Sequence, residues 1–373
     1  FGSSEAGIRA PFGARELSAL VMRWGVIGTG KIAHDFVTAL FASKTETVVA
    51  VASRALDRAQ QFASAHNVEA AYGSYSQLLD AEVDIVYVAN GTVDHVSTTL
   101  ACLARRKPVL VEKPMALTAA GGRALAAAAE SAGVFLMEGV WMHFFPVIKE
   151  VAALIAAGEI GEISSVQASF GWRNPMEHNP AVEDAAQGGG ALGAVGIYLV
   201  HLALMAFGGA RPSKIEAIGE LGPLGADVHT SMLLGWPGNK HASLTCSLRE
   251  NFAGEAVIHG SKGSVHLPFP FLCPLKAEVR VDGAEPRLLE DKLPVSDEVR
   301  DADGAVISNS FNLVNSAGLV YEAEAVGSAL IARQLQSERV PLEMSLLALE
   351  IMDEIRNKMG LVYSDKHSEV SSA

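Results

Sequence analysis

Short apolar segments alternate with longer segments of helical spacing through the first 140 residues. The apolar segments, each of about four to six residues, lie at 24–27, 47–52, 84–89, 108–111 and 134–137. Helix-compatible segments lie between them, at 31–42, 56–66, 95–106 and 119–132. Buried strands that alternate with helices indicate a parallel sheet with right-handed crossovers. This pattern predicts a doubly wound α/β domain.

The pattern changes after a further predicted helix at 146–157. Strand-like segments follow at 163–170, 214–220, 230–236, 242–248, 255–259, 264–267 and 277–281. Several of them are separated by glycine-containing turns, and such short connections favour antiparallel pairing. Two helices, at 319–336 and 345–359, follow the strands. The second half is therefore predicted to be an α/β domain on an open, mostly antiparallel sheet.

These patterns divide the chain into two domains with extensions. We expect a dinucleotide-binding type of domain at 23–145 and a substrate and dimerisation domain at 146–363, which includes the last two helices. Residues 1–22 are predicted to be an N-terminal extension, and residues 364–373 a tail.

One apolar stretch requires a test for membrane insertion. Residues 188–210 contain no Asp, Glu, Lys or Arg, and the stretch is about as long as a membrane-spanning helix. It opens with three glycines, contains His201 and lacks aromatic belts and a basic flank. We therefore expect a buried core helix over 191–207 and no membrane partner.

The charge and the cysteines narrow the class of protein further. The 373 residues include 29 Lys and Arg against 42 Asp and Glu, a net charge of −13, which argues against a nucleic-acid partner. Cys102, Cys246 and Cys273 form no Cys-x-x-Cys pair, so neither a disulfide framework nor a metal site is expected. Free thiols fit a reducing compartment, and we expect a cytoplasmic protein.

A glycine motif at 28–33, Gly-Thr-Gly-Lys-Ile-Ala, follows the first predicted strand and opens the first predicted helix. The first glycine allows a tight turn, the second lets the backbone approach a pyrophosphate, and the small third position lets the helix pack on the strand. The helix N-terminus adds oriented N–H groups. An ordinary turn can carry this motif, but here strand, turn and helix occur in the required order. The predicted cofactor-binding residues are Gly28, Thr29, Gly30, Lys31 and Ile32.

The end of the second strand indicates which dinucleotide is bound. A carboxylate at this place would bind the ribose 2′-hydroxyl of NAD, but the chain has Ser53 and Arg54, with Arg58 one helical turn further on. Guanidinium groups pair bidentately with a phosphate such as the 2′-phosphate of NADP. The alternative is that both arginines only solvate the helix start, and Asp57 lies close by. We predict that these three residues bind the cofactor and that NADP is preferred to NAD.

A second motif, Glu112-Lys113-Pro114, follows the fourth strand at 108–111. Ligands of open α/β sheets gather beyond the carboxyl ends of the strands, which places Lys113 where chemistry occurs. A surface lysine at a strand end is the alternative, and the residues alone leave both interpretations open.

Several segments together resemble the glucose-fructose oxidoreductase/inositol dehydrogenase family. The motifs that carry the resemblance are 28–33, 112–114, 137–141, 188–192 and 196–198. Three further segments are similar to its branch of dimeric dihydrodiol dehydrogenases and NADP-dependent D-xylose dehydrogenases: 53–54, 144–146 and 344–360. The resemblance covers about residues 23–363. It implies a Rossmann domain, a C-terminal α/β domain whose sheet supports a homodimer, and hydride transfer from a hydroxyl of a sugar or diol.

The same resemblance implies roles for individual residues. Lys113 matches the family lysine, and Tyr198 matches the tyrosine that donates or accepts the proton. A phenol with a pKa of about 10 is a poor base at neutral pH, and a neighbouring ammonium favours its phenolate form. The cofactor site also includes Asn90, Thr92, His95, Glu112 and Lys113. The substrate site includes Trp141, His143, Trp172, Arg173, Tyr198 and His201.

Some of these assignments have structural alternatives. His95 could equally cap its helix, and aromatic side chains are more often core than pocket wall. Ala194 stands where the family usually has Asp, four positions before Tyr198, and alanine can neither hold substrate hydroxyls nor orient the lysine. His201 shares a helix face with Tyr198 and could replace part of that function, or it is a hydrogen-bonded core histidine.

The sequence therefore predicts an NADP-dependent dehydrogenase of an aldose or vicinal diol, of the D-xylose dehydrogenase or trans-dihydrodiol dehydrogenase type. Tyr198 would act as the acid or base and Lys113 as the cation that tunes it. Ala194 motivates one alternative, a catalytically silent NADP-binding regulatory protein. The other is an enzyme that uses NADP redox internally for elimination or epimerisation.

Overall fold

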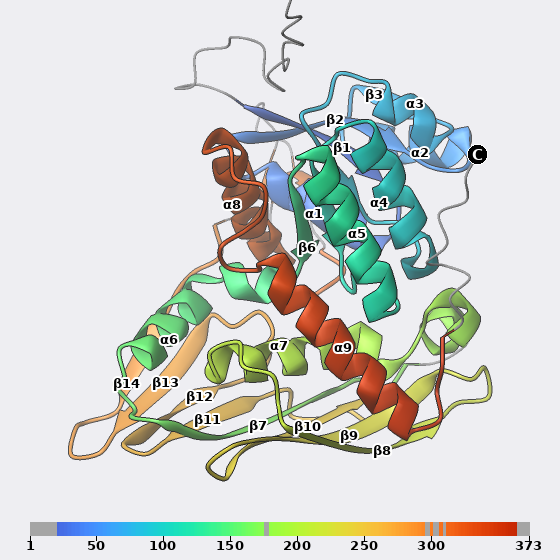
Figure 1. Cartoon of the computed structure of the whole chain (residues 1–373). Helices are drawn as coiled ribbons and strands as arrows, with labels where there is room; N and C mark the ends of the chain where they lie inside the picture. The colour runs from blue at the N-terminus through green and yellow to red at the C-terminus, as the bar shows by residue number, and fades with distance from the viewer. Residues whose placement is uncertain (1–20, 175–178, 295–298, 301–305, 309–310, 364–373) are drawn as a thin grey trace, which may run out of the picture.

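The computed structural model describes residues 21–174, 179–294, 299–300, 306–308 and 311–363. Residues 1–20 and 364–373 of the predicted extension and tail lie outside the described residues. Met22, which the sequence assigned to the extension, belongs to the first strand. Figure 1 shows two sheets, with the N-terminal domain above and the larger C-terminal sheet below.

The N-terminal domain contains a six-stranded sheet in the order β3-β2-β1-β4-β5-β6, and every pair in it is parallel. This is the strand order of a Rossmann domain. The strands are β1 (Met22–Ile27), β2 (Glu46–Ala52), β3 (Ala70–Tyr72), β4 (Ile85–Val88), β5 (Val109–Glu112) and β6 (Leu136–Gly139). The inner strands β4 and β5 are buried throughout, as expected for strands covered on both faces. The doubly wound fold is confirmed.

Helices cover both faces of this sheet. They are α1 (Lys31–Leu40), α2 (Leu56–Ala65), α3 (Tyr75–Leu79), α4 (His95–Ala104) and α5 (Ala119–Ala132). Thr118 caps α5, since its Oγ1 accepts from the Gly121 N–H at 3.2 Å, and Gly133 ends the helix at φ +59°. The short elements β3 and α3 were not predicted.

The C-terminal domain contains an eight-stranded sheet in the order β14-β13-β12-β11-β7-β10-β9-β8. Its strands are β7 (Ile163–Gly171), β8 (Lys214–Leu221), β9 (Asp227–Trp236), β10 (Lys240–Ser247), β11 (Ala256–Gly260), β12 (Gly263–Leu267), β13 (Lys276–Val281) and β14 (Arg287–Glu290). The β7–β10 pair is parallel, and the remaining pairs are antiparallel. The predicted open, mostly antiparallel sheet is confirmed. A small separate hairpin joins β15 (Val299–Arg300) and β16 (Val306–Ser308).

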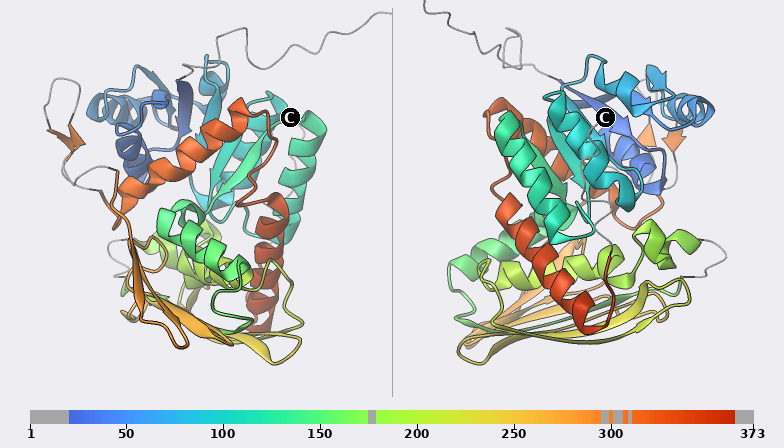
Figure 2. Two further views of the ribbon diagram at one scale, coloured as in Figure 1. Left: turned by 90° about the vertical axis from the view of Figure 1, so that its left-hand side faces the viewer. Right: turned by 45° about the vertical axis from the view of Figure 1, so that its right-hand side comes forward.

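Helices α6 (Pro146–Ala156) and α7 (Ile197–Ala206) lie on the face of this sheet that points toward the Rossmann domain, as Figure 2 shows. Nearly every residue of α7 is buried, which agrees with the predicted core helix. Among the described residues, no helix is long and apolar enough to cross a membrane.

The last two helices return to the first domain. Helix α8 (Leu319–Ile331) packs beside α1 and against β2, and α9 (Leu342–Lys358) lies between α5, α7 and β8. Helix α8 ends five residues before the predicted boundary at 336. The segment before α8 is fastened to α1, because the Asp35 carboxylate accepts from Asn312 N at 2.8 Å, Leu313 N at 2.9 Å and Ser316 Oγ at 2.7 Å. The C-terminal segment therefore packs against the N-terminal domain, and the two domains are in contact.

Candidate active site

A cleft of about 600 Å³ lies at the carboxyl ends of the Rossmann strands. Most of the predicted cofactor residues line it: Gly28, Thr29, Gly30, Ile32, Ser53, Arg54, Arg58, Asn90, Thr92 and Lys113. Lys31, His95 and Glu112 do not. The opposite wall comes from residues 187–190 and 193–194, just before α7. The cleft thus lies between the two domains.

The two glycines of the first motif differ in what surrounds them. Gly28 has φ +116°, and a Cβ there would lie 2.3 Å from the Ala89 carbonyl oxygen, so the tight turn requires glycine. A Cβ at Gly30 would meet nothing within 4 Å. The open space beside Gly30 leaves the backbone at the start of α1 accessible to a ligand. The residues present therefore fit a dinucleotide pyrophosphate.

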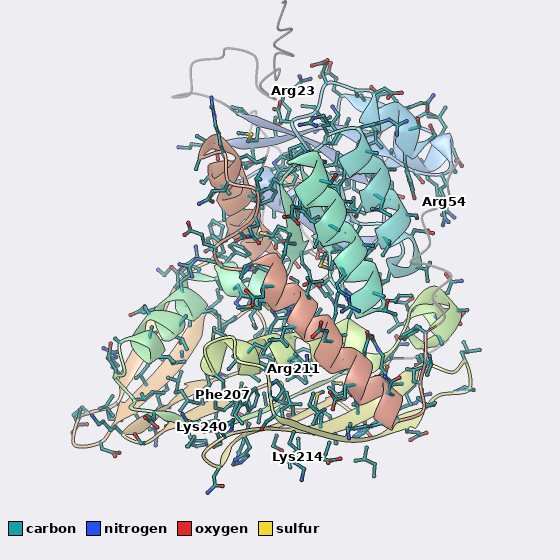
Figure 3. The ribbon with its side chains drawn as sticks, viewed as in Figure 1. Arg23, Arg54, Phe207, Arg211, Lys214 and Lys240 are labelled. Carbon is teal, nitrogen blue, oxygen red and sulfur yellow. The ribbon has the colours of Figure 1, made fainter. Side chains whose placement is uncertain are left out.

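The end of the cleft beside β2 is basic. Arg54 and Arg58 line it, and none of its described lining residues is Asp or Glu. Arg54 projects from the edge of the Rossmann domain (Figure 3), and its Nη1 lies 3.5 Å from Asp94 Oδ2. Such an exposed ion pair is weak, so the guanidinium can exchange this partner for a phosphate.

Lys113 and Tyr198 come together from the two domains. Lys113 directly follows β5, and Tyr198 lies in the first turn of α7. The Lys113 Nζ is 5.1 Å from the centroid of the phenol ring. The Lys113–Pro114 peptide bond is cis. The Lys113 Nζ donates a hydrogen bond of 2.6 Å to the Ala194 carbonyl oxygen. An amine and a phenol ring from distant parts of the chain therefore lie side by side. Lys113 lines the cleft, whereas Tyr198 is buried and is not one of the lining residues.

A π-helical turn, η6 (Leu192–Gly196), presents the Ala194 carbonyl to the lysine. The carboxylate of Asp227 fixes the start of this turn, since its Oδ2 accepts from the Leu192 N–H at 2.7 Å. The Ala194 backbone carbonyl thus contacts the lysine at the position where the family resemblance led us to expect a carboxylate. Sequence reasoning missed Asp227, because β9 carries no motif that links it to α7.

The electrostatic setting of the pair differs from the sequence expectation. Burial, and after it the carboxylates of Glu112 and Glu322, raise the pKa of Tyr198 well above 10. Burial lowers the pKa of Lys113 from its usual value, while Glu112 and Glu138 oppose that change. The predicted lowering of the phenol pKa by the ammonium is outweighed by burial and nearby acids. Tyr198 is therefore a protonated phenol at neutral pH.

His95 lies beneath the cleft and does not line it. Its Nδ1 is 2.8 Å from the Pro114 carbonyl oxygen and its Nε2 is 3.3 Å from the Asn90 carbonyl oxygen. Burial lowers its pKa from 6.5, which favours the neutral ring. His95 thus connects the loops after β4 and β5, both of which contribute lining residues.

The predicted substrate residues are dispersed. Trp141, His143 and His201 are buried and do not line the cleft, and the His143 Nε2 lies 3.1 Å from the His201 Nδ1. This geometry favours the core alternative for His201. Trp172 is half-buried and Arg173 is exposed, with its N–H bound to Asn251 Oδ1 at 2.8 Å. Tyr198 is the member of the predicted set that the structure brings to Lys113.

We also searched the described part of the chain for a metal site and for reactive cysteines. It contains no group of three or more His, Cys, Asp or Glu side chains that could hold a metal ion. Cys102, Cys246 and Cys273 are free and buried, and burial raises the pKa of each thiol.

The Rossmann sheet, the glycine turn and the cleft between two domains define a dinucleotide-dependent oxidoreductase. Residues 22–140 match the family described as "Oxidoreductase family, NAD-binding Rossmann fold", and residues 148–266 match the "GFO/IDH/MocA C-terminal domain". The chain belongs to this family, which is the one that its motifs resemble.

The similar proteins are dehydrogenases and reductases. Trans-1,2-dihydrobenzene-1,2-diol dehydrogenase of Mus musculus is 36% identical over 347 residues, which cover 92% of this chain and 98% of the relative. The enzyme of the same name from Homo sapiens is 35% identical, with the same shares covered.

Solved structures show the same architecture. KijD10, a 3-ketoreductase from Actinomadura kijaniata in complex with NADP and TDP-benzene, superposes with a TM-score of 0.73 at 26% identity over 91% of this chain and 98% of that chain. Aldose-aldose oxidoreductase from Caulobacter crescentus has a TM-score of 0.75 at 20% identity, over 90% and 97% of the two chains, and supports the fold alone.

Proposed function

We propose that this chain is an NADP-dependent dehydrogenase that interconverts a hydroxyl and a carbonyl group of an aldose or vicinal diol. The observation that carries the proposal is the contact of the Lys113 amine, which lines the cleft, with the Tyr198 phenol ring, whose centroid is 5.1 Å away. The trans-dihydrodiol dehydrogenases, which share about a third of its residues, support the choice of a diol or sugar.

The choice of NADP rests on the basic end of the cleft beside β2. Arg54 and Arg58 supply positive charge, and no described lining residue supplies a carboxylate for a ribose 2′-hydroxyl. The similar 3-ketoreductase KijD10 was solved with NADP, which agrees with this choice.

Tyr198 would transfer the proton, and Lys113 would polarise the reacting oxygen of the substrate. In carbonyl reduction the Tyr198 phenol gives its proton to the carbonyl oxygen, while the Lys113 ammonium stabilises the negative charge that develops there. The nicotinamide, when bound, exchanges a hydride with the substrate carbon. In alcohol oxidation Tyr198 takes the hydroxyl proton. The Ala194 carbonyl holds the amine in place during both directions.

The raised pKa of Tyr198 suits one direction better than the other. A phenol that stays protonated at neutral pH is ready to donate, so carbonyl reduction proceeds without a prior proton loss. Oxidation requires the phenolate, whose population increases with pH.

We further propose a homodimer through the outer face of the C-terminal sheet, as the family resemblance implies. Figure 2 shows no helix on this side of the sheet. On neighbouring strands Ile218 is 76% exposed and Leu233 49% exposed. The strand register puts Leu233 opposite Glu216 and Ser243, so this face combines apolar, small polar and acidic side chains. A second copy of the chain would cover it. The three free, buried thiols support a cytoplasmic location.

The test is a turnover assay on the purified chain. NADP⁺ or NAD⁺ is supplied with a panel of aldoses and vicinal diols, including trans-dihydrodiols, and the appearance of reduced nicotinamide is measured. Substrate-dependent NADPH formation, stronger than NADH formation, is expected. NADP binding without turnover would replace the proposal with a silent regulatory protein. Substrate conversion without net NADPH would indicate internal redox for elimination or epimerisation.

A further inference from the structure

The chain that follows α9 turns back toward the cleft. Gly360, at φ +75°, ends the helix in a Schellman motif, in which the Leu361 N–H donates to the Arg356 carbonyl oxygen at 2.9 Å. The reversal brings Tyr363 against the Arg356 side chain, whose Cζ lies 4.8 Å from the centroid of the phenol ring. In Figure 1 this segment runs beside the chain that leads into α7. Arg356 and Tyr363 are therefore packed together next to the C-terminal domain's wall of the cleft.

The Tyr363 hydroxyl contacts that wall directly. Its Oη donates to the Gly189 carbonyl oxygen at 2.5 Å, and Gly189 lines the cleft. Burial raises the pKa of Tyr363 to about 12, although Arg356 opposes this change, so the phenol keeps its proton and can donate. Tyr363 is not among the described residues that line the cleft. It thus holds the wall from outside the cleft.

Gly189 has no side chain through which the wall could be held. A Cβ at this position would lie 2.5 Å from the Val182 carbonyl oxygen, so only glycine fits. The Gly189 N–H donates to the Asp184 carbonyl oxygen at 2.9 Å, and the Gly190 N–H donates to the Val182 carbonyl oxygen at 2.7 Å. These bonds join neighbours within one loop. The bond from Tyr363 instead ties Gly189 to an element far along the chain.

Arg356 connects the same segment to the Rossmann domain. The side chain is 2% exposed, and its Nη1 donates to the Leu117 carbonyl oxygen at 2.7 Å. Leu117 lies in the loop that follows Lys113. The Arg356 charge faces Asp353 Oδ1 at 3.4 Å, and the other oxygen of Asp353 accepts from the Ala119 N–H at 2.8 Å. The end of α9 is therefore fastened to the loop that leads from Lys113 to α5.

The two walls of the cleft meet at this point. A Cβ at Gly188 would lie 2.7 Å from Leu117 Cδ2. A Cβ at Gly193 would lie 3.7 Å from Arg356 Nη2 and 3.8 Å from Pro114 Cγ. Side chains of the Rossmann loop thus pack directly on glycines of the opposite wall, and the Arg356 guanidinium lies beside this contact.

We infer that Tyr363, supported by Arg356, is a positioning residue that holds the Gly189 wall at a fixed distance from the Rossmann wall, so that the cleft is shaped before its ligands bind. The inference rests on the proposed function, in which those ligands are NADP and a sugar or diol. It concerns binding and not the chemical step, because Asp227 separately fixes the turn that presents Ala194.

Tyr363→Phe removes the hydroxyl and keeps the ring over Arg356, so the bond to Gly189 alone is lost. The wall must then become ordered when a ligand binds, which weakens binding. The KM for the substrate and the NADPH dissociation constant are expected to rise about fivefold. The kcat is expected to stay within about twofold of the wild-type value.

Tyr321→Phe is the matched control. The Tyr321 Oη also donates to a backbone carbonyl, that of Lys292 at 3.1 Å, and neither residue lines the cleft. The control therefore loses the same kind of bond away from the site, and it should keep the wild-type KM and NADPH affinity. Wild-type values of both constants in folded Tyr363→Phe would overturn the inference, and so would equal rises in the two variants.

A second measurement reports the wall itself and needs no turnover. Amide hydrogen exchange is compared between the unliganded wild-type chain and Tyr363→Phe. Exchange in residues 186–190 is expected to become about fivefold faster, while residues 114–119 keep the wild-type rate because Arg356 still holds Leu117. Equal exchange of residues 186–190 in the two proteins would also overturn the inference.

The inference and the proposed function fail in different ways. If the chain converts no sugar or diol, the proposed function fails, and hydrogen exchange still decides whether Tyr363 holds the wall. If turnover occurs and Tyr363→Phe changes neither exchange nor binding, the proposed function stands and the positioning role is wrong.

Discussion

Lys113 and Arg54 show how two cations in one cleft serve different purposes. The Lys113 amine is held by a backbone carbonyl and faces buried acids, whereas the Arg54 side chain is 79% exposed at the edge of the domain. A buried charge interacts mainly with the groups packed around it, whereas an exposed charge can bind an anion that arrives from solvent. The two residues can therefore be tested separately.

Replacing Lys113 by Met should abolish turnover and leave cofactor binding intact. The loss in kcat is expected to be about a hundredfold or more, because the ammonium acts on the reacting oxygen. NADPH fluorescence titration and steady-state turnover are measured together. The exposed Lys44→Met is the control and should behave as wild type. Unchanged turnover in Lys113→Met would remove the mechanism.

Replacing Arg54 by Ala should weaken NADP far more than NAD. Removing a charge-assisted contact of this kind is expected to lower the affinity for NADP about tenfold or more. NAD lacks the 2′-phosphate, so its affinity should change little. Titration of both dinucleotides gives the two dissociation constants. Arg105→Ala, also at the Rossmann surface but paired with Asp80, serves as a control. Equal losses for the two dinucleotides would contradict a phosphate contact.

The protonation state of Tyr198 predicts a pH dependence of the oxidation rate. Burial raises the pKa of the phenol well above 10, so the phenolate is scarce at neutral pH and its population increases with pH. The oxidation kcat should therefore rise from neutral to mildly alkaline pH. Stopped-flow measurement of hydride transfer tests this, with Tyr198→Phe as the variant that lacks the dependence. A flat profile in the wild type would exclude Tyr198 as the proton acceptor.

At the scale of elements, the position of the π-helical turn η6 depends on the three glycines at 188–190 that precede it. Gly190 has φ +131°, and a Cβ there would lie 2.2 Å from Asp227 Oδ1. The same carboxylate binds the Leu192 N–H through its other oxygen. The close approach of backbone and carboxylate thus sets where Ala194 and Lys113 meet.

Gly190→Ala should destabilise the protein and displace this turn. The left-handed backbone and the clash with Asp227 together are expected to reduce the free energy of unfolding by about 2 kcal/mol or more. Urea unfolding measures it. Gly208→Ala is a matched control, since Gly208 has φ +66° and no atom within 4 Å of the added Cβ. A similar loss in both variants would mean that backbone strain alone, without the Asp227 contact, accounts for the effect.

Elements with strong periodicity were predictable, and short or irregular ones were not. The parallel strands, α7 as a core helix and the antiparallel sheet followed from runs of apolar residues. Strand β3 has three residues and α3 has five, too few for a period to emerge. The π-helical turn has no sequence signal of its own, because its geometry depends on a carboxylate from β9.

At the scale of the whole molecule, the proposed homodimer forms through the outer face of the C-terminal sheet. Ile218→Arg adds a charge to the outer face at the edge strand β8, where Ile218 is 76% exposed. The proposed dimer should dissociate to monomers, because a buried unpaired charge is strongly unfavourable at an interface. Sedimentation velocity measures the mass. Leu335→Arg, on the loop after α8 and 52% exposed, should leave the mass unchanged. A wild-type mass equal to the monomer would end the proposal.

The sequence by itself determined the fold class, the glycine turn, the basic residues after β2 and the Lys113 motif, because each depends on neighbours within a few positions. Only the tertiary structure decided what surrounds the lysine. The Ala194 carbonyl and the Tyr198 ring reach it from separate elements. The charge and protonation of a buried group are set by burial and by side chains close in space. Those neighbours are distant along the chain, so no local pattern could have revealed them.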